Sequence, residues 1–429
     1  MASTQEIKRT RLPNGLNLEW VRFPNQLDLL LIENREDPSF VYQTWFDVGS
    51  LTEKLDPKLK RTGLAHLFEH MMFRGTEKYP DGEFDRLLSR YGGYNNATTW
   101  NDRTNYYEVM AQGNLERVIQ LESDRFQNLI VDEKLLETER GAVLGEYRMG
   151  RDNASTVAYD HLYATALDRH PYRYTVIGTE EEIKSFTVEE ANDFYHRYYS
   201  PDCATIMIAG DFDSEQAKLL VNQYYGQIQS VGKFERPKPE LEVKQEKQKW
   251  FEFKHPQISE TRLIFAYHTP EFAHPDMAAL LVFDSILTQG RGAVLFQRWV
   301  SDHPWVSDVQ SSVDQFKYPA LFGVDCDLQK DVDPKQILKD FDQLLKTKVT
   351  EEEVERALNQ LLLDLYENWE DMAETCNFIG ESLVSAGDPL YGFELVEKIK
   401  KIKADDIEQV KKRYFNSENR TVIIGRAQS

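Results

Sequence analysis

Residues 183–209 read IKSFTVEEANDFYHRYYSPDCATIMIA, and residues 399–425, which lie 216 positions later, read IKKIKADDIEQVKKRYFNSENRTVIIG. The two stretches align without gaps. In each, an acidic pair opens a helical stretch, an Arg-Tyr-aromatic triplet follows, and a β-rich run comes last. Acidic residues in the first turn and basic residues later suit the helix dipole. Each copy therefore predicts a helix, a turn and a closing strand, and the repeat predicts two similar halves.

The remaining pattern predicts an α+β fold. Short apolar or alternating stretches favour strands, and stretches with helical spacing favour helices. Strands and helices do not alternate strictly, so we predict two homologous halves, each a mainly antiparallel sheet with flanking helices. In the first half, strands are predicted at 16–20, 27–32, 41–48, 106–110 and 204–209, and helices at 63–73, 82–91, 114–129, 133–149 and 155–166.

The boundary between the halves is predicted from composition. Residues 228–250 are charged, contain Pro237 and Pro239, and have no apolar period, which is typical of a linker. We therefore predict a first half at 1–230, a linker at 231–250 and a second half at 251–429.

Composition excludes several classes of protein. The chain has 429 residues, of which 41% are hydrophobic and 29% charged, so it is neither disordered nor of low complexity. A formal charge of −21 argues against general binding to nucleic acids or anionic membranes, and favours a basic or neutral partner. The cysteines Cys203, Cys326 and Cys376 lie far apart, which predicts neither a disulfide scaffold nor a cysteine metal site.

The sequence also gives an expectation for localisation. No run of 18 apolar residues occurs, and residues 1–11 are polar and charged, so neither a membrane span nor a signal-peptide core is predicted. The chain as written is expected in the cytoplasm, or in the periplasm or an organelle if a targeting segment has been removed.

A pair of histidines carries the chemistry. Residues 66–70 read HLFEH and lie in the predicted helix 63–73. Residues four apart share one face of a helix, so His66 and His70 can face one metal ion, with Glu69 beside them. The H-x-x-E-H order is that of the inverse zinc peptidases. The same pattern also arises by coincidence on helical faces with solvated or core histidines.

A catalytic zinc site normally has three protein ligands, so a third must come from elsewhere in the chain. Glu146, which lies 76 residues after His70 in a second predicted helix, is the candidate. Glu139 lies two turns earlier on the same helical face and could orient one of the ligands.

The chain resembles the pitrilysin or insulinase-type zinc metallopeptidases, specifically the zinc-bearing subunit of the short processing-peptidase branch. The resemblance rests on H-x-x-E-H with the two later glutamates, and on three phrases. These phrases are GGYNNATT at 92–99, HPY at 170–172 and AGDF at 209–212.

The resemblance implies a role for each site residue. His66, His70 and Glu146 would bind one Zn²⁺ per chain, and Glu69 would be the general base. It also implies that residues 95–100 form an edge strand, where Asn96 and Ala97 contact an extended substrate. The alternative is a buried strand after a Gly-Gly turn.

The second half is predicted to have lost the site. The 216-residue offset places Val282, Ser285 and Ile286 opposite the motif, and none of them can replace it. Relatives often carry an Arg-Tyr pair that stabilises the reaction intermediate, but His303 and Ser307 occupy those positions here. The resemblance therefore implies a heterodimer in which a homologous subunit supplies the pair and completes a clam-like chamber. The alternative is a homodimer.

These observations predict a zinc-dependent endopeptidase that hydrolyses short or unfolded peptides. The alternative is a non-catalytic structural subunit of a larger assembly that keeps a vestigial zinc site. Intact Glu69 and Glu146 favour the enzyme, because a scaffold has no use for a general base.

Overall fold

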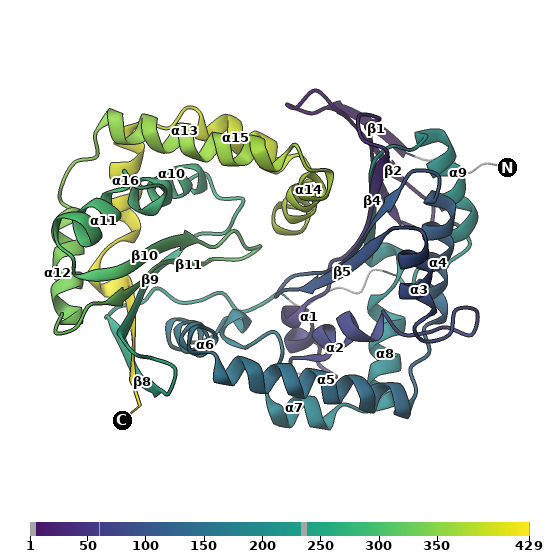
Figure 1. The fold of residues 1–429 in the computed structure, drawn as a ribbon, viewed down its shortest axis with the longest axis horizontal. Coiled ribbons are helices and arrows are strands. Elements are labelled where there is room, and N and C mark those ends of the chain that lie inside the picture. Colours follow the sequence, from purple (N-terminus) through teal and green to yellow (C-terminus); the bar gives the residue numbers. More distant parts are fainter. Residues whose placement is uncertain (1–5, 60, 233–237, 429) are drawn as a thin grey trace. The chain divides into compact units, whose positions relative to one another are not determined.

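The structure, a computed structural model, describes residues 6–59, 61–232 and 238–428 (Figure 1). These residues group into two compact units, and each unit takes its residues from three separate segments. Unit 1 comprises the described residues of Met1–Tyr147, Thr175–Lys238 and Trp369–Gly380, and unit 2 those of Arg148–Tyr174, Pro239–Asn368 and Glu381–Ser429.

Unit 1 is built on a seven-stranded sheet in the order β1-β2-β3-β7-β4-β6-β5. Neighbouring strands are antiparallel except β3 and β7, which run parallel. The strands are β1 (Glu6–Arg11), β2 (Asn17–Arg22), β3 (Asp28–Glu33), β4 (Ser39–Phe46), β5 (Tyr94–Thr99), β6 (Thr104–Ala111) and β7 (Ala204–Gly210).

Helices cover one face of this sheet and form the core with it. Along β4, the side chains of Phe40, Tyr42 and Phe46 point to that face and are buried in the main cluster, as the two-residue period of a strand dictates. The helices are α1 (Ser50–Leu55), α2 (Leu64–Met71), α3 (Glu83–Arg90), α4 (Leu115–Asn128), α5 (Glu133–Asp152, whose last turn belongs to unit 2), α7 (Glu180–Ser185), α8 (Val188–Tyr198), η2 (Pro201–Cys203) and α9 (Ser214–Tyr225).

Unit 2 is built on a five-stranded sheet in the order β10-β11-β9-β12-β8. Its strands are antiparallel apart from the parallel pair of β8 and β12. The strands are β8 (Lys249–His255), β9 (Thr261–Thr269), β10 (Val306–Val313), β11 (Ala320–Leu328) and β12 (Arg420–Ala427), and the helices are α6 (Ala154–Ala166), η1 (Pro171–Arg173), α10 (Met277–Thr288), α11 (Val294–Phe296), η3 (Gln297–Asp302), α12 (Pro334–Leu344), α13 (Glu351–Asn368), α14 (Met372–Ala386, whose first turns belong to unit 1), α15 (Tyr391–Ile399), α16 (Ala404–Tyr414) and η4 (Ser417–Asn419).

The predicted α+β class is confirmed, and so is the sequence repeat. Helix α8, the short helix η2 and strand β7 start at positions that coincide, at an offset of 216 residues, with the starts of α16, η4 and β12. The five predicted strands and five predicted helices of the first half are all present, with ends shifted by a few residues. The sequence analysis did not predict β1 or the helices α1, α7 and α9.

The two units exchange a segment. Helix α6, from the first half of the sequence, packs on β8, β9 and β12 of unit 2. Residues 369–380, from the second half, belong to unit 1, where Asn377 accepts a hydrogen bond from the amide of Gln43 at 3.1 Å. The 216-residue offset places α6 on residues 370–382, so the exchanged segments are equivalents in the repeat. A single cut at 231–250 therefore does not separate the compact units.

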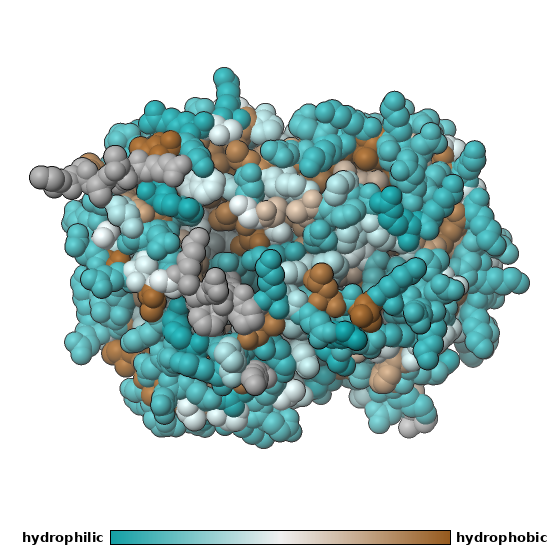
Figure 2. Space-filling model, turned by 180° about the vertical axis from the view of Figure 1, so that it is seen from behind, coloured by the Kyte–Doolittle hydropathy of each residue, from teal (hydrophilic) through white to brown (hydrophobic). Residues whose placement is uncertain are grey.

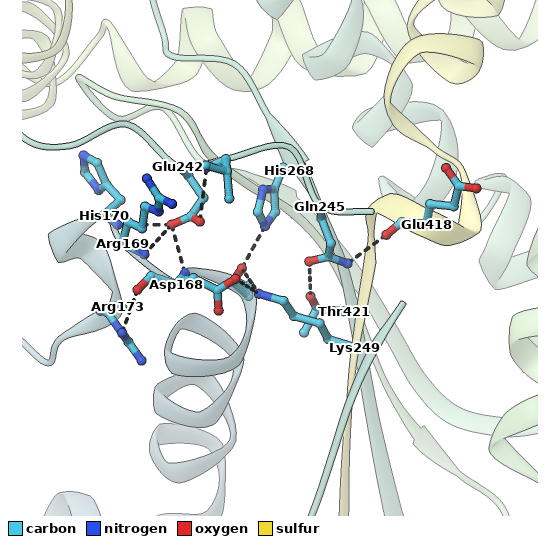
Figure 3. Close-up of polar contacts among 12 residues, drawn as sticks. Asp168, Arg169, His170, Arg173, Glu242, Gln245, Lys249, His268, Glu418 and Thr421 are labelled. Atoms are coloured by element: carbon cyan, nitrogen blue, oxygen red, sulfur yellow. Dashed lines mark hydrogen bonds and ion pairs between the residues drawn. The ribbon is translucent and has the colours of Figure 1, made fainter. Parts of the chain in front are cut away.

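Residues 239–248, within the predicted linker, have no helix or strand but are fixed to unit 2 (Figure 3). One carboxylate oxygen of Glu242 accepts the backbone N–H groups of residues 168, 169 and 170 at 2.8–3.1 Å. Gln245 donates to the carbonyl oxygens of Glu418 and Arg420. This half of the linker is thus a structured part of unit 2, whereas residues 233–237 lie outside the described residues.

The surface reflects the charged composition. On the face drawn in Figure 2, hydrophilic residues cover most of the surface, and hydrophobic residues occur in small scattered groups. In the described part of the chain, no helix has the length and apolar character needed to cross a membrane.

His170 makes the stability of unit 2 sensitive to acid. Its imidazole is 1% exposed, and burial lowers its pKa to about 4. Since the unfolded value is about 6.5, the unfolded chain binds more protons between these two values, and stability falls as the pH falls through that window. Acidification from pH 7 to 5 should therefore cost about 2 kcal/mol through His170.

Urea unfolding of wild type and His170→Asn at both pH values measures this contribution. Asn keeps the side-chain acceptor that His170 offers to the N–H of Tyr172, but it does not titrate. The variant should lose about 2 kcal/mol less than wild type on acidification. Equal losses in the two proteins would contradict the assignment.

Candidate metal centre

Helix α2 presents the H-x-x-E-H motif on its polar face. Its apolar residues Leu64, Leu67, Phe68 and Met71 are buried in the core of unit 1. The helical period then turns residues 66, 69 and 70 away from the core, where each is only partly buried. The predicted helix at 63–73 is thus present, and its amphipathic pattern sets the direction of the histidines.

Helix α5 brings both predicted glutamates to this face. An oxygen of Glu146 lies 3.6 Å from Nε2 of His66 and 3.4 Å from Nε2 of His70. An oxygen of Glu139 lies 3.5 Å from Nδ1 of His70. Glu139 and Glu146 are seven residues apart, which is two helical turns, so one helix reaches both sides of the same imidazole.

The arrangement fits a zinc ion. Ligand atoms about 2.0–2.1 Å from a tetrahedral zinc lie about 3.3 Å from one another, close to the distances from Glu146 to the two histidines. The ligand atoms of His66, His70 and Glu146 all lie within 4.8 Å of one another. Within the described ranges, they are the only group of three or more His, Cys, Asp or Glu side chains with that geometry.

The charges at the site also suit a cation. Burial lowers the pKa of His66, which keeps its imidazole neutral. Burial alone would lower the pKa of His70, but hydrogen bonds with Glu139 and Glu146 outweigh it and raise that pKa to about 9. The hydrogen bond to His70 lowers the pKa of Glu146. A metal ion would therefore replace the proton of His70 between ionised carboxylates.

Arg74 is a neighbour of the site that the sequence analysis missed. Its Nε donates to Glu139 at 2.6 Å, and its guanidinium also pairs with Asp81 at 3.2 Å. Burial would raise the pKa of Glu139, but His70 and Arg74 together lower it. Glu139 is therefore ionised although it is 2% exposed. The sequence carries no signal for this pair, because the burial of Glu139 is seen only in the structure.

Glu69 lies one turn after His66 on the same helix. Its charge raises the pKa of His66, which partly offsets the effect of burial. Behind it, the hydroxyl of Tyr106 donates to the carbonyl oxygen of Phe68 at 3.0 Å and contacts the hydroxyl of Tyr199 at 2.9 Å. These buried contacts fix the stretch of α2 that carries Glu69.

Asn96 and Ala97 lie on β5, an edge strand of the sheet. Among the described strands, β5 pairs only with β6, where Ala97 is opposite Tyr106. The N–H of Ala97 donates to the side-chain oxygen of Asn96 at 2.9 Å. Two large hydrophobic side chains are exposed at the ends of this stretch, Tyr94 at 59% and Trp100 at 51%.

The second half differs from the first at the corresponding positions. Helix α10 carries Val282, Ser285 and Ile286, and all three are buried. Val282 and Ile286 belong to the hydrophobic core of unit 2, and the hydroxyl of Ser285 donates to the carbonyl oxygen of Ala357 at 3.2 Å. The hydroxyl of Ser307, on β10, donates to a carboxylate oxygen of Glu260 at 2.8 Å. The ring of His303 stacks on Trp305, with the ring centres 4.7 Å apart.

Comparisons with known proteins add a family relationship. The insulinase (peptidase family M16) model matches residues 29–180, and the peptidase M16 inactive domain model matches residues 185–361. The chain is 24% identical over 419 residues to the zinc protease PqqE of Helicobacter pylori (strain ATCC 700392 / 26695), covering 96% of this chain and 91% of that protein.

Two mitochondrial proteins are similar as well. The mitochondrial-processing peptidase subunit beta of Bos taurus is 26% identical over 389 residues, covering 86% of this chain and 76% of that protein. The cytochrome b-c1 complex subunit 1 of Rattus norvegicus is 24% identical over 393 residues, covering 89% and 81%.

A solved structure shares the fold. The crystal structure of a protease from Helicobacter pylori superimposes with a TM-score of 0.89 at 23% identity, covering 95% of this chain and 99% of that chain.

Proposed function

Because the chain belongs to the insulinase family of peptidases, family M16, we propose that it is a zinc-dependent endopeptidase that hydrolyses short or unfolded peptides. The proposal rests on one observation: the ligand atoms of His66, His70 and Glu146 lie within 4.8 Å of one another, close enough to bind one zinc ion. This set leaves one tetrahedral position for water or substrate, as a catalytic zinc site requires.

Each residue of the proposed site would have a separate role in peptide hydrolysis. His66, His70 and Glu146 would hold the zinc. When bound, zinc lowers the pKa of a coordinated water and polarises the peptide carbonyl. Glu69 takes the proton of the attacking water on its carboxylate and delivers it to the leaving amine. Glu139 accepts a hydrogen bond from Nδ1 of His70 and so fixes the imidazole for Nε2 ligation.

The edge strand β5 would bind the substrate backbone. An extended peptide can add to a free sheet edge through main-chain hydrogen bonds. In this proposal, the N–H of Ala97 donates to a carbonyl oxygen of the peptide instead of to the side chain of Asn96. The released side chain of Asn96 then contacts the substrate. The free edge and the local contact between these two residues support the role.

A second subunit would complete the site. His303 and Ser307 stand where relatives carry the Arg-Tyr pair, and the hydroxyl of Ser307 is engaged by Glu260. We propose a heterodimer with a homologous chain that supplies the pair and closes a clam-like chamber, with a homodimer as the alternative. The name of one relative, a processing peptidase subunit beta, supports a paired assembly.

A non-catalytic structural role is the second candidate. The similarity to a cytochrome b-c1 complex subunit favours it, because that name describes a component of a larger complex. In that case the zinc site would be a vestige. The presence of Glu69 beside a full ligand set favours the enzyme.

The metal site predicts zinc uptake that depends on Glu146. Wild type should bind one zinc per chain, and Glu146→Gln should weaken binding on the order of 100-fold, because a neutral amide is a poorer ligand than a carboxylate. Competition with a chelator at limiting zinc measures the affinity. Glu139→Gln is the matched variant on the same helix, and it should lose roughly 10–100-fold in affinity or activity. Undiminished binding by Glu146→Gln would remove this residue from the ligand set.

A further inference from the structure

A buried carboxylate sits at the start of the helix that carries the histidines. Glu53, in α1, is 0% exposed. One of its oxygens accepts the N–H of Leu64 at 2.7 Å, and the other accepts the N–H of Ala65 at 2.8 Å. Leu64 and Ala65 are the first two residues of α2, and His66 follows directly.

Helix α2 needs a cap that its own sequence does not supply. The first N–H groups of a helix have no partner within the helix, and they are usually bonded by a side chain at the N-cap position. Here the N-cap is Gly63, with φ +109°, and a Cβ at this position would lie 2.6 Å from the carbonyl oxygen of Ile177. No capping side chain fits there. Glu53 provides the acceptors from eleven residues upstream.

The other end of α2 is fixed as well. The hydroxyl of Tyr106 donates to the carbonyl oxygen of Phe68, and the guanidinium of Arg125 donates to that of Met72 at 3.2 Å. The C-terminal half of the helix is thus held by two contacts to buried side chains. The first turn, which contains His66, is held through Glu53.

We propose that Glu53 is a positioning residue of the metal centre. It caps α2 from outside the helix and thereby holds the imidazole of His66 next to the carboxylate of Glu146. This inference rests on the zinc site proposed above. Without the cap, the first turn of α2 frays, and the Nε2 atom of His66 no longer holds its place 3.6 Å from Glu146.

The test is designed for the ionised carboxyl group, because both of its oxygens are then acceptors only. Burial raises the pKa of Glu53 to about 8, while the backbone N–H groups of residues 63–65 act in the opposite direction. The test is therefore performed at pH 8.5.

The variant Glu53→Gln tests the capping hydrogen bonds with two measurements that do not depend on global stability. Its amide can accept from one N–H but directs an NH₂ group at the other. Zinc affinity should fall by roughly 10–100-fold, as for other residues that orient ligands. In the metal-free protein, hydrogen exchange at the amides of Leu64 and Ala65 should become faster.

Asp56→Asn is the matched control. Asp56 is also a buried carboxylate, 1% exposed, next to α1, and it accepts from the N–H of Lys58 and the hydroxyl of Tyr198, both at 2.8 Å. This variant should lose global stability but keep the zinc affinity and the protection of the Leu64 and Ala65 amides.

The outcomes distinguish the two proposals. If wild type binds no zinc, the proposed function fails, whereas the exchange rates still test the cap. If wild type binds zinc and Glu53→Gln binds it equally well, the positioning role is wrong. Should Glu53→Gln not fold, Glu53→Asp replaces it, since it keeps the charge but is one methylene shorter. Wild-type affinity and protection in that variant would overturn the role.

Discussion

Replacement of Glu69 by Gln should reduce peptide hydrolysis by about 10²–10⁴-fold, the range that general acid–base catalysis contributes. Gln has nearly the same shape but cannot accept a proton from water. The proposed ligands His66, His70 and Glu146 are untouched, so the variant should still bind one zinc per chain. Steady-state assays on a peptide library, with metal analysis of the same sample, measure both quantities.

The matched control for this variant is Glu133→Gln. Glu133 is an exposed glutamate in the first turn of α5, so the substitution removes the same charge at a distance from the motif. Its turnover should equal that of wild type. Near-wild-type turnover by Glu69→Gln would exclude Glu69 as the base, and loss of zinc would make it a ligand instead.

The chain alone, fully loaded with zinc, should be about 100–1,000-fold slower than in complex with the proposed homologous partner, because removal of one donor to a developing oxyanion typically costs that much. His303 and Ser307 cannot replace the Arg-Tyr pair, since the first stacks on Trp305 and the second bonds Glu260. Turnover by the purified chain, before and after addition of a homologous chain that has the pair and lacks H-x-x-E-H, measures the effect.

The partner itself provides the control for this experiment. A partner chain with its Arg and Tyr changed to Ala should still bind but should not accelerate turnover. Full turnover by the lone chain, with no binding or acceleration by the homologue, would reject the heterodimer and favour a homodimer or monomer.

Local periodicity explains why much of the fold was predictable. The helix and the strand of the repeat were predictable in both halves, because each copy has its own acidic first turn and its own apolar stretch at the end. In α8 the capping box between Thr187 and Glu190 is visible in the sequence and present in the structure. The H-x-x-E-H spacing likewise places His66 and His70 on one face of α2. The two-turn spacing of Glu139 and Glu146 lets these carboxylates face the two ring nitrogens of His70.

Contacts between distant segments were not predictable. Glu53 and Arg74 are ordinary charged residues in the sequence, and their roles follow only from burial and from the backbone or carboxylate that they meet. The exchange of α6 for residues 369–380 has no local signature either. It depends on close fits such as Gly380 against Trp45, where even a Cβ would lie 2.3 Å from the indole.

The exchanged segments also affect how the protein is made. Domains of a growing chain usually fold in order, the N-terminal one first, as each leaves the ribosome. Unit 1 cannot follow that order, because its last segment ends at residue 380 although its other parts end at 238. Until then the side of β4 that carries Gln43 and Trp45 lacks its covering helix. This face of the sheet therefore stays uncovered from the synthesis of β7, which ends at residue 210, until residue 380 has been made.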